Sequence, residues 1–191
     1  RLLFFCIGDV SGHGIASALF MARAIGLLRI LAMTTFQPDE LLTKLNERLC
    51  VNNDTNLFLT IFCAFLDIET GRMVYSNGGH CPPFLGTAGK LTDLAITKGP
   101  LVGALPAARF AAMTQMLNRE DVVYCYTDGV TEAQNQAGHE FSEDRCKDRL
   151  GQHHSQPLQQ VLDDMRRQVA IFTATEVLED DFTMLAIRRK M

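Results

Sequence analysis

The sequence predicts an α+β protein that forms a single domain over residues 1–191. Strands follow one another through short turns, and the helices stand in separate blocks. This order is typical of antiparallel sheets with helices packed outside them, and it does not fit a doubly wound α/β sheet. The 191 residues are 47% hydrophobic, which is enough for a substantial core. We find no internal repeat, low-complexity tract or linker.

The first half of the chain is expected to contain a strand, two helices and a long hairpin. A continuous apolar run at 2–7 predicts a strand buried on both faces, and a glycine-rich loop follows it. The next helix is apolar nearly all round, so we expect it to be buried between other elements. Pro38 suits the first turn of the second helix. The expected ranges are strand 2–7, helix 15–34, helix 38–50, strand 57–66 and strand 72–76.

The second half is expected to hold shorter strands, one long loop and two helices. The apolar run from Val122 to Tyr126 predicts a buried strand that leads directly into Asp128 and Gly129. Glycine and proline recur within residues 97–110, so we expect this segment to form a surface loop. The other expected elements are strands 84–85 and 90–94, an irregular loop 131–141, helices 143–151 and 157–172, and strand 182–187.

Composition argues against several classes of protein. The formal net charge is −4 and the basic residues are scattered, which argues against a basic surface that binds nucleic acid. The six cysteines lack metal-binding spacing, so we interpret them as reduced residues of a cytoplasmic protein. The longest apolar stretch contains Arg23 and Arg29, which favours a packed helix over one that spans a membrane.

Acidic residues stand where three predicted strands meet their turns: Asp9, Asp128 and the pair Asp180 and Asp181. Each could serve only to make a turn. If the fold gathers them, however, the carboxylates would repel one another unless cations lie between them. Carboxylates without histidine or thiolate ligands favour Mg²⁺ or Mn²⁺. Two such ions can lower the pKa of a water molecule between them and bind a phosphoryl oxygen.

Four blocks of the sequence resemble the PPM-type bacterial protein phosphatases, relatives of protein phosphatase 2C in the subgroup named for SpoIIE and RsbU. The blocks occur in the order of the family and cover essentially the whole chain. They are Gly8-Asp-Val-Ser-Gly-His-Gly14, Asn77-Gly-Gly-His-Cys-Pro-Pro83, Tyr126-Thr-Asp-Gly-Val-Thr-Glu132 and Asp180-Asp-Phe-Thr-Met-Leu185. The resemblance implies a sandwich of two antiparallel β-sheets flanked by helices, with a two-metal site at one end.

The resemblance also implies a role for individual residues. Asp9 is similar to the acid that bridges both metal ions, and Val10 would offer its backbone carbonyl to one of them. Asp128 resembles the metal-binding acid of the T-D-G turn. Asp180 aligns with the last metal ligand, with Asp181 as the alternative. The implied reaction is hydrolysis of phosphoserine or phosphothreonine by metal-activated water, without a phospho-enzyme, by a phosphoric monoester hydrolase.

The family context sets further expectations. Members usually carry a G-G-D block upstream, which is absent here, so we expect the N-terminal strands to be missing and the chain to be the C-terminal output domain of a longer regulator. The alternative is a non-catalytic PPM-fold module that binds a partner. Expected partners are a phosphorylated anti-anti-sigma (STAS-type) protein in stress or sigma-factor signalling, an upstream sensor or receiver domain, and a second copy in a homodimer. The 2C relatives carry an aspartate near the position of His80. We expect His80 to order its own glycine turn.

Overall fold

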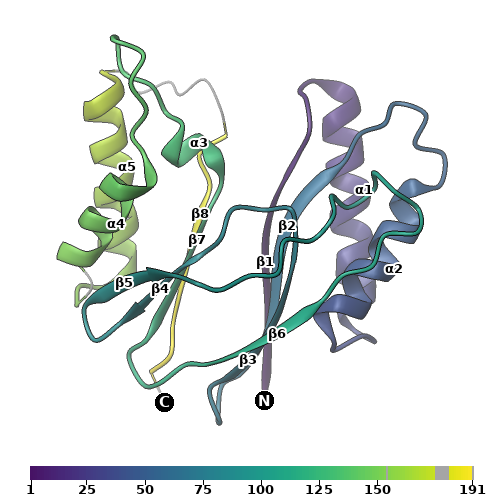
Figure 1. Cartoon of the computed structure of the whole chain (residues 1–191), viewed down its shortest axis with the longest axis horizontal. Helices are drawn as coiled ribbons and strands as arrows, with labels where there is room; N and C mark the ends of the chain where they lie inside the picture. The colour runs from purple at the N-terminus through teal and green to yellow at the C-terminus, as the bar shows by residue number, and fades with distance from the viewer. Residues whose placement is uncertain (154, 175–180, 191) are drawn as a thin grey trace. The chain divides into compact units, whose positions relative to one another are not determined.

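The computed structural model describes residues 1–153, 155–174 and 181–190. Within this part the chain forms two compact units, and it passes from one to the other more than once. The first unit consists of Arg1–His80 and Ala95–Met116, and the second of Cys81–Leu94 and Leu117–Met191. Each unit contains one four-stranded antiparallel sheet with helices beside it (Figure 1). The α+β class with two antiparallel sheets is therefore confirmed.

The first unit is built on a sheet with the strand order β1-β2-β3-β6. Two helices, α1 (Ile15–Ala32) and α2 (Pro38–Cys50), pack on one face of it. The predicted stripe on α2 is confirmed, because Leu41, Leu42 and Leu45 are fully buried. The strands are β1 (Leu2–Val10), β2 (Leu59–Asp67), β3 (Arg72–Gly78) and β6 (Ala112–Met116). The last of these was missed in the sequence, because its alternating exposure leaves it without an apolar run.

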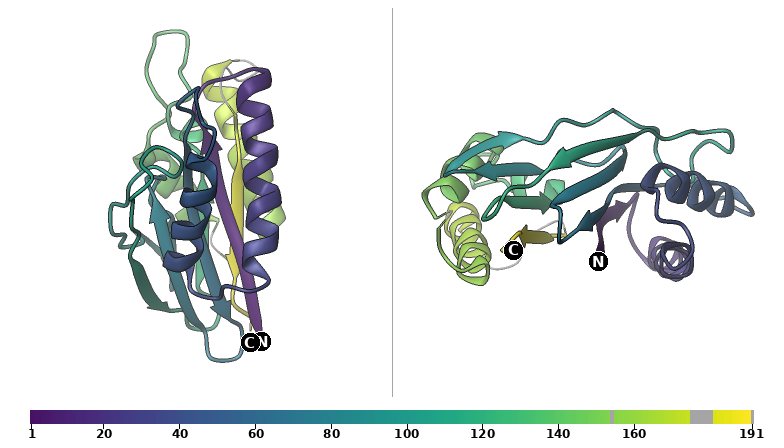
Figure 2. Two further views of the ribbon diagram at one scale, coloured as in Figure 1. Left: turned by 90° about the vertical axis from the view of Figure 1, so that its right-hand side faces the viewer. Right: turned by 90° about the horizontal axis from the view of Figure 1, so that it is seen from below.

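Helix α1 corrects one expectation. It was predicted to be buried on all sides, yet of its residues only Ser17, Phe20, Ala24 and Leu28 are buried. The helix runs alongside β1 with α2 next to it (Figure 2), and its other face stays exposed. An all-apolar helix gives no periodic signal that marks the covered side. With a mean hydropathy of 1.8, α1 is long and apolar enough to cross a membrane. This test considers only length and composition, and helices that pack into a protein core also meet it.

The second unit repeats the arrangement with a sheet of order β5-β4-β7-β8. Alternate residues of β7 (Val122–Tyr126) contribute to a core shared with two helices, as the side-chain alternation of a strand requires. The bounds of β7 match the prediction. The remaining elements are β4 (Phe84–Thr87), β5 (Lys90–Asp93), α3 (Asp128–Thr131), α4 (Glu143–Gln152), α5 (Leu158–Thr173) and β8 (Met184–Arg188).

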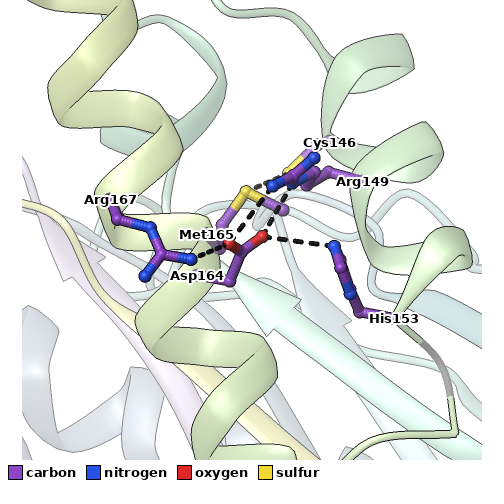
Figure 3. Close-up of polar contacts among 6 residues, drawn as sticks. All are labelled: Cys146, Arg149, His153, Asp164, Met165 and Arg167. Atoms are coloured by element: carbon purple, nitrogen blue, oxygen red, sulfur yellow. Dashed lines mark hydrogen bonds and ion pairs between the residues drawn. The ribbon is translucent and has the colours of Figure 1, made fainter.

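Helices α4 and α5 are joined by charged groups around Asp164, whose side chain is 8% exposed. Arg149 of α4 forms a forked pair with this carboxylate, through Nε at 2.7 Å and Nη2 at 3.2 Å. Arg167 of α5 contacts the same carboxylate, and His153 Nε2 lies 3.5 Å from it (Figure 3). The hydrogen bond from Arg149 is the main reason why the pKa of Asp164 is lowered from its usual value. The cluster therefore stabilises the contact between the two helices.

We predict that Asp164→Asn lowers the free energy of unfolding at pH 7 by roughly 1.5–3 kcal/mol, because it removes charged hydrogen bonds. The lowered pKa means that this contribution is complete above the carboxyl's unfolded pKa of about 4. It is lost as the pH falls through the lower folded value, so the difference between variant and wild type should shrink at acid pH. Urea unfolding at several pH values measures it.

Asp163→Asn is the matched control. Asp163 lies next to Asp164 on α5 but is exposed, and its side chain accepts a hydrogen bond from Gln159 at 2.9 Å. The control should change the unfolding free energy by less than about 0.5 kcal/mol. Equal effects of the two substitutions would contradict the role given to the buried carboxylate.

Candidate functional site

The end of β1 presents Asp9 and Val10 from the first unit. The sequence suggested a loop here, but the strand continues through both residues. Asp9 lies opposite Thr60 of β2, and the Ser11 amide donates to the Phe58 carbonyl at 2.9 Å. Hydrogen-bonded and non-hydrogen-bonded pairs alternate along an antiparallel ladder, so Asp9 and Thr60 exchange backbone hydrogen bonds. The Val10 carbonyl then points away from β2, on the outer edge of the sheet.

The Asp9 side chain projects from the face of this sheet opposite to the helices. Val10 packs into the core beneath α1 and α2, and successive side chains of a strand point to opposite faces. Thr60 shares the face of Asp9 because the two are directly opposite. The preceding Gly8 permits this close pairing, since a Cβ there would lie 2.5 Å from the Thr60 carbonyl oxygen.

A glycine turn after β3 completes the surroundings of Asp9. The side chain that bonds within this turn belongs to Asn77, which accepts from the His80 amide at 2.9 Å and donates to the His80 carbonyl at 2.8 Å. Asn77 therefore orders the turn, and the role expected of His80 within it stays a prediction. The His80 ring also reaches β2, where Nδ1 lies 2.9 Å from the Thr60 hydroxyl.

Asp128 occupies a corresponding position in the second unit, directly after β7. It begins the one-turn helix α3, where the sequence suggested a simple turn. Its carbonyl accepts from the Glu132 amide at 2.8 Å, and its Oδ1 accepts from the Gly129 amide at 3.1 Å. The carboxylate is half-buried. These bonds fix the backbone of Asp128 at the end of a fully buried strand.

Thr127 connects this position to the segment that leads into β8. Its hydroxyl donates to the Asp181 carbonyl at 2.7 Å and accepts from the Thr183 amide at 3.1 Å. The backbones of Asp128 and Asp181 are thereby held side by side, although 53 positions separate them in the chain. Asp181 is exposed, and Asp180, the ligand preferred from the sequence, lies outside the described residues.

The surroundings of Asp128 carry negative potential. Burial is the main cause that raises the pKa of the neighbouring Cys81 thiol to about 11, and the charges of Asp128, Glu143 and Glu132 add to it. The same three acids therefore lie near the Cys81 thiol and near one another. A bound cation would relieve the repulsion among these acids.

The predicted site residues thus fall into two pairs. Asp9 and Val10 lie together in the first unit, and Asp128 and Asp181 lie together in the second. Among residues 1–153, 155–174 and 181–190, no three His, Cys, Asp or Glu side chains form a group that could hold a metal ion. The donors present are carboxylate and carbonyl oxygens, and the Val10 carbonyl points away from its own ladder. This donor chemistry fits Mg²⁺ or Mn²⁺.

Comparison with known proteins decides the family. The profile of the family "Stage II sporulation protein E (SpoIIE)" matches residues 1–190. The chain belongs to the SpoIIE family. Protein IcfG of Synechocystis sp. is 26% identical over 215 residues, a region that covers 98% of this chain and 34% of that protein. Phosphoserine phosphatase RsbU of Bacillus subtilis is 28% identical over 187 residues, covering 97% of this chain and 55% of RsbU. The chain therefore spans between a third and just over half of these relatives.

A solved structure confirms the fold of this SpoIIE-family chain. The crystal structure of the RsbU and RsbW domains of a Mycobacterium tuberculosis protein aligns with a TM-score of 0.84 and 25% identity. The alignment covers 99% of this chain and 52% of that one. The resemblance to PPM-type phosphatases inferred from four short blocks is therefore confirmed over nearly the whole length.

The sequence of this SpoIIE-family chain singled out the candidate acids, but not the polar residues that bond to the backbone around them. Three side chains hydrogen-bond to backbone groups near the candidate acids. The partners are Asp9 for Thr60, His80 for Asn77 and Asp181 for Thr127. The signal for two of them was available in the motifs, since Asn77 opens the glycine turn and Thr127 directly precedes Asp128. Thr60 sits inside an apolar strand, where its partner is set only by the strand register.

We predict that Thr127→Val destabilises the second unit by about 1–2 kcal/mol, because two buried hydrogen bonds are lost while the volume is kept. Amide hydrogen exchange at Thr183 should accelerate, since that amide loses its acceptor. Thr127→Ser keeps the hydroxyl and should retain both the stability and the protection. Unchanged exchange at Thr183 in the valine variant would contradict this assignment.

Proposed function

We propose that this chain is a metal-dependent phosphoprotein phosphatase domain that hydrolyses phosphoserine or phosphothreonine. The observation that carries the proposal is the pair of acid-bearing strand ends, one at Asp9 and one at Asp128, each with its backbone fixed by hydrogen bonds. Membership of the SpoIIE family supports it. So does the similarity to RsbU, a relative named as a phosphoserine phosphatase.

In this proposal the acids bind Mn²⁺ or Mg²⁺ ions. Asp9 would supply its carboxylate and Val10 its carbonyl, and the other ligands would be Asp128 and either Asp180 or Asp181. Bound ions of this kind lower the pKa of water and polarise a phosphoryl group. The chain's own contribution is to hold rigid oxygen ligands at strand ends, so that little reorganisation is needed during the reaction.

The first test is hydrolysis of a phosphoserine peptide with and without Mn²⁺. We predict activity that a chelator abolishes and that Asp128→Asn lowers by more than about 100-fold, because a lost ligand charge removes several kcal/mol of transition-state stabilisation. Circular dichroism should show that the variant stays folded. Asp163→Asn, on the exposed side of α5, should retain full activity.

Two results would contradict the proposal. Full activity of Asp128→Asn would remove this residue from the site. Calorimetry that detects no Mn²⁺ binding to the wild type would favour the alternative of a non-catalytic module that binds a partner. Side-by-side turnover of phosphopeptides and nucleotides tests the substrate class, and faster turnover of nucleotides would replace a protein substrate with a small molecule.

The proposal extends to partners. By the resemblance to the SpoIIE and RsbU subgroup, the proposed substrate is a phosphorylated anti-anti-sigma protein of the STAS type, and an upstream sensor or receiver domain would supply the signal. A second copy of the chain would pack on the exposed face of α1. The support for this last point is the apolar character of that face, where Ile15, Leu19 and Ile30 are between 66% and 81% exposed.

We predict that a dimer forms through this face and that Leu19→Glu dissociates it, since a charge would be buried at an apolar interface. Sedimentation equilibrium measures the association. The control is Leu105→Glu, because Leu105 is 62% exposed but belongs to the loop between β5 and β6 and not to α1. A monomeric wild type, or equal dimerisation of wild type and Leu19→Glu, would contradict the prediction.

A further inference from the structure

His80 is held in one position by the turn that carries it. The two bonds from Asn77 fix its backbone, and a Cβ on Gly79 would lie 2.6 Å from the side chain of Leu101. Gly79 also has a positive φ of 75°, which glycine adopts without strain. The His80 side chain is buried, at 5% exposure. A buried imidazole on a fixed backbone can impose its position on the group that it contacts.

The group that it contacts is the Thr60 hydroxyl, at 2.9 Å from Nδ1. That hydroxyl also lies 3.4 Å from the Asp9 carbonyl, to which it donates; this distance is long for such a bond. A hydroxyl has a single hydrogen, so if Thr60 donates to Asp9 it must accept from His80. The order of donors is then His80 Nδ1–H to Thr60 Oγ1, and Thr60 O–H to the Asp9 carbonyl.

This chain of hydrogen bonds acts on the peptide group between Asp9 and Val10. The peptide group is planar, so fixing the Asp9 carbonyl also fixes the plane from which Val10 continues. The Asp9 carboxylate and the Val10 carbonyl are the two donors that the proposed function assigns to the first unit. Thr60 therefore holds this peptide through both its backbone and its side chain, and His80 sets the side-chain contact.

We propose that His80 is a positioning residue, which acts through Thr60 to hold Asp9 and Val10 in the orientation that binds divalent ions. The inference rests on the proposed function, because it assigns a role within the same metal site. Residues that orient metal ligands in this way typically contribute about 10–100-fold to metal affinity when substituted.

Conservative variants separate the two ring nitrogens. In His80→Asn the amide nitrogen replaces Nδ1 at a similar distance from the backbone, whereas in His80→Gln the amide reaches the position of Nε2. We expect the Kd for Mn²⁺, measured by calorimetry, to rise about 10–100-fold in His80→Gln and in Thr60→Val. His80→Asn and Thr60→Ser, which keep the chain of hydrogen bonds, should stay within about threefold of the wild type.

Tyr75→Phe is the matched control for the loss of a hydrogen bond in the same unit. The Tyr75 hydroxyl donates to the Ala95 carbonyl at 2.6 Å, and Tyr75 lies on β3 without contact to Asp9 in the strand pairing. This variant should lose stability in thermal unfolding but keep the Mn²⁺ affinity of the wild type. Wild-type affinity in both His80→Gln and Thr60→Val would overturn the inference and leave the proposed phosphatase intact.

A measurement on the unmodified protein decides the inference without any variant or metal. Long-range NMR correlations between the ring nitrogens and the carbon-bound ring protons of His80 identify which nitrogen carries a hydrogen. The inference requires a hydrogen on Nδ1. A neutral ring with its hydrogen on Nε2 alone would overturn it, even if the protein hydrolyses phosphopeptides. Failure of the wild type to bind Mn²⁺, by contrast, would overturn the proposed function itself.

Discussion

The pairing of β1 with β2 is the constraint on which the first half of the candidate site depends. Its register places Asp9 opposite Thr60, and the absence of a side chain at Gly8 lets the two backbones approach. A slip of one residue would turn Asp9 toward the helices and bury its charge in the core, which would cost far more than the core could offset. The alternation of core and site residues along β1 therefore protects both the fold and the position of the acid.

The two units fix an acidic residue at the end of a strand by different hydrogen bonds. In the first unit the neighbouring strand provides them, through the backbone and hydroxyl of Thr60. In the second unit the hydroxyl of Thr127 holds the segment at Asp181, while the first turn of α3 holds Asp128. Both arrangements rest on neutral hydrogen bonds.

Much of the fold could be predicted from local patterns. The continuous apolar run of β7 predicts a buried strand, and the leucine spacing of α2 predicts a helix with one buried side. Both predictions were confirmed. Predictions failed where the pattern was uniform or weak. Helix α1 is apolar all round, so the sequence could not tell which side the sheet covers, and β6 alternates without an apolar run. Asp9 and Val10 lie within a strand because pairing with β2 overrides the glycine and serine that follow.

The amino-acid sequence by itself determined the family and singled out the acids that are proposed to bind metal, because the residue types alone show four ordered motifs. Only the tertiary structure decided which polar side chains hold those acids. Thr60 and Asp9 are 51 positions apart, and Thr127 and Asp181 are 54 apart. Hydrogen bonds over such separations follow from strand register and turn geometry, which depend on packing of the whole sheet and leave no local trace in the sequence.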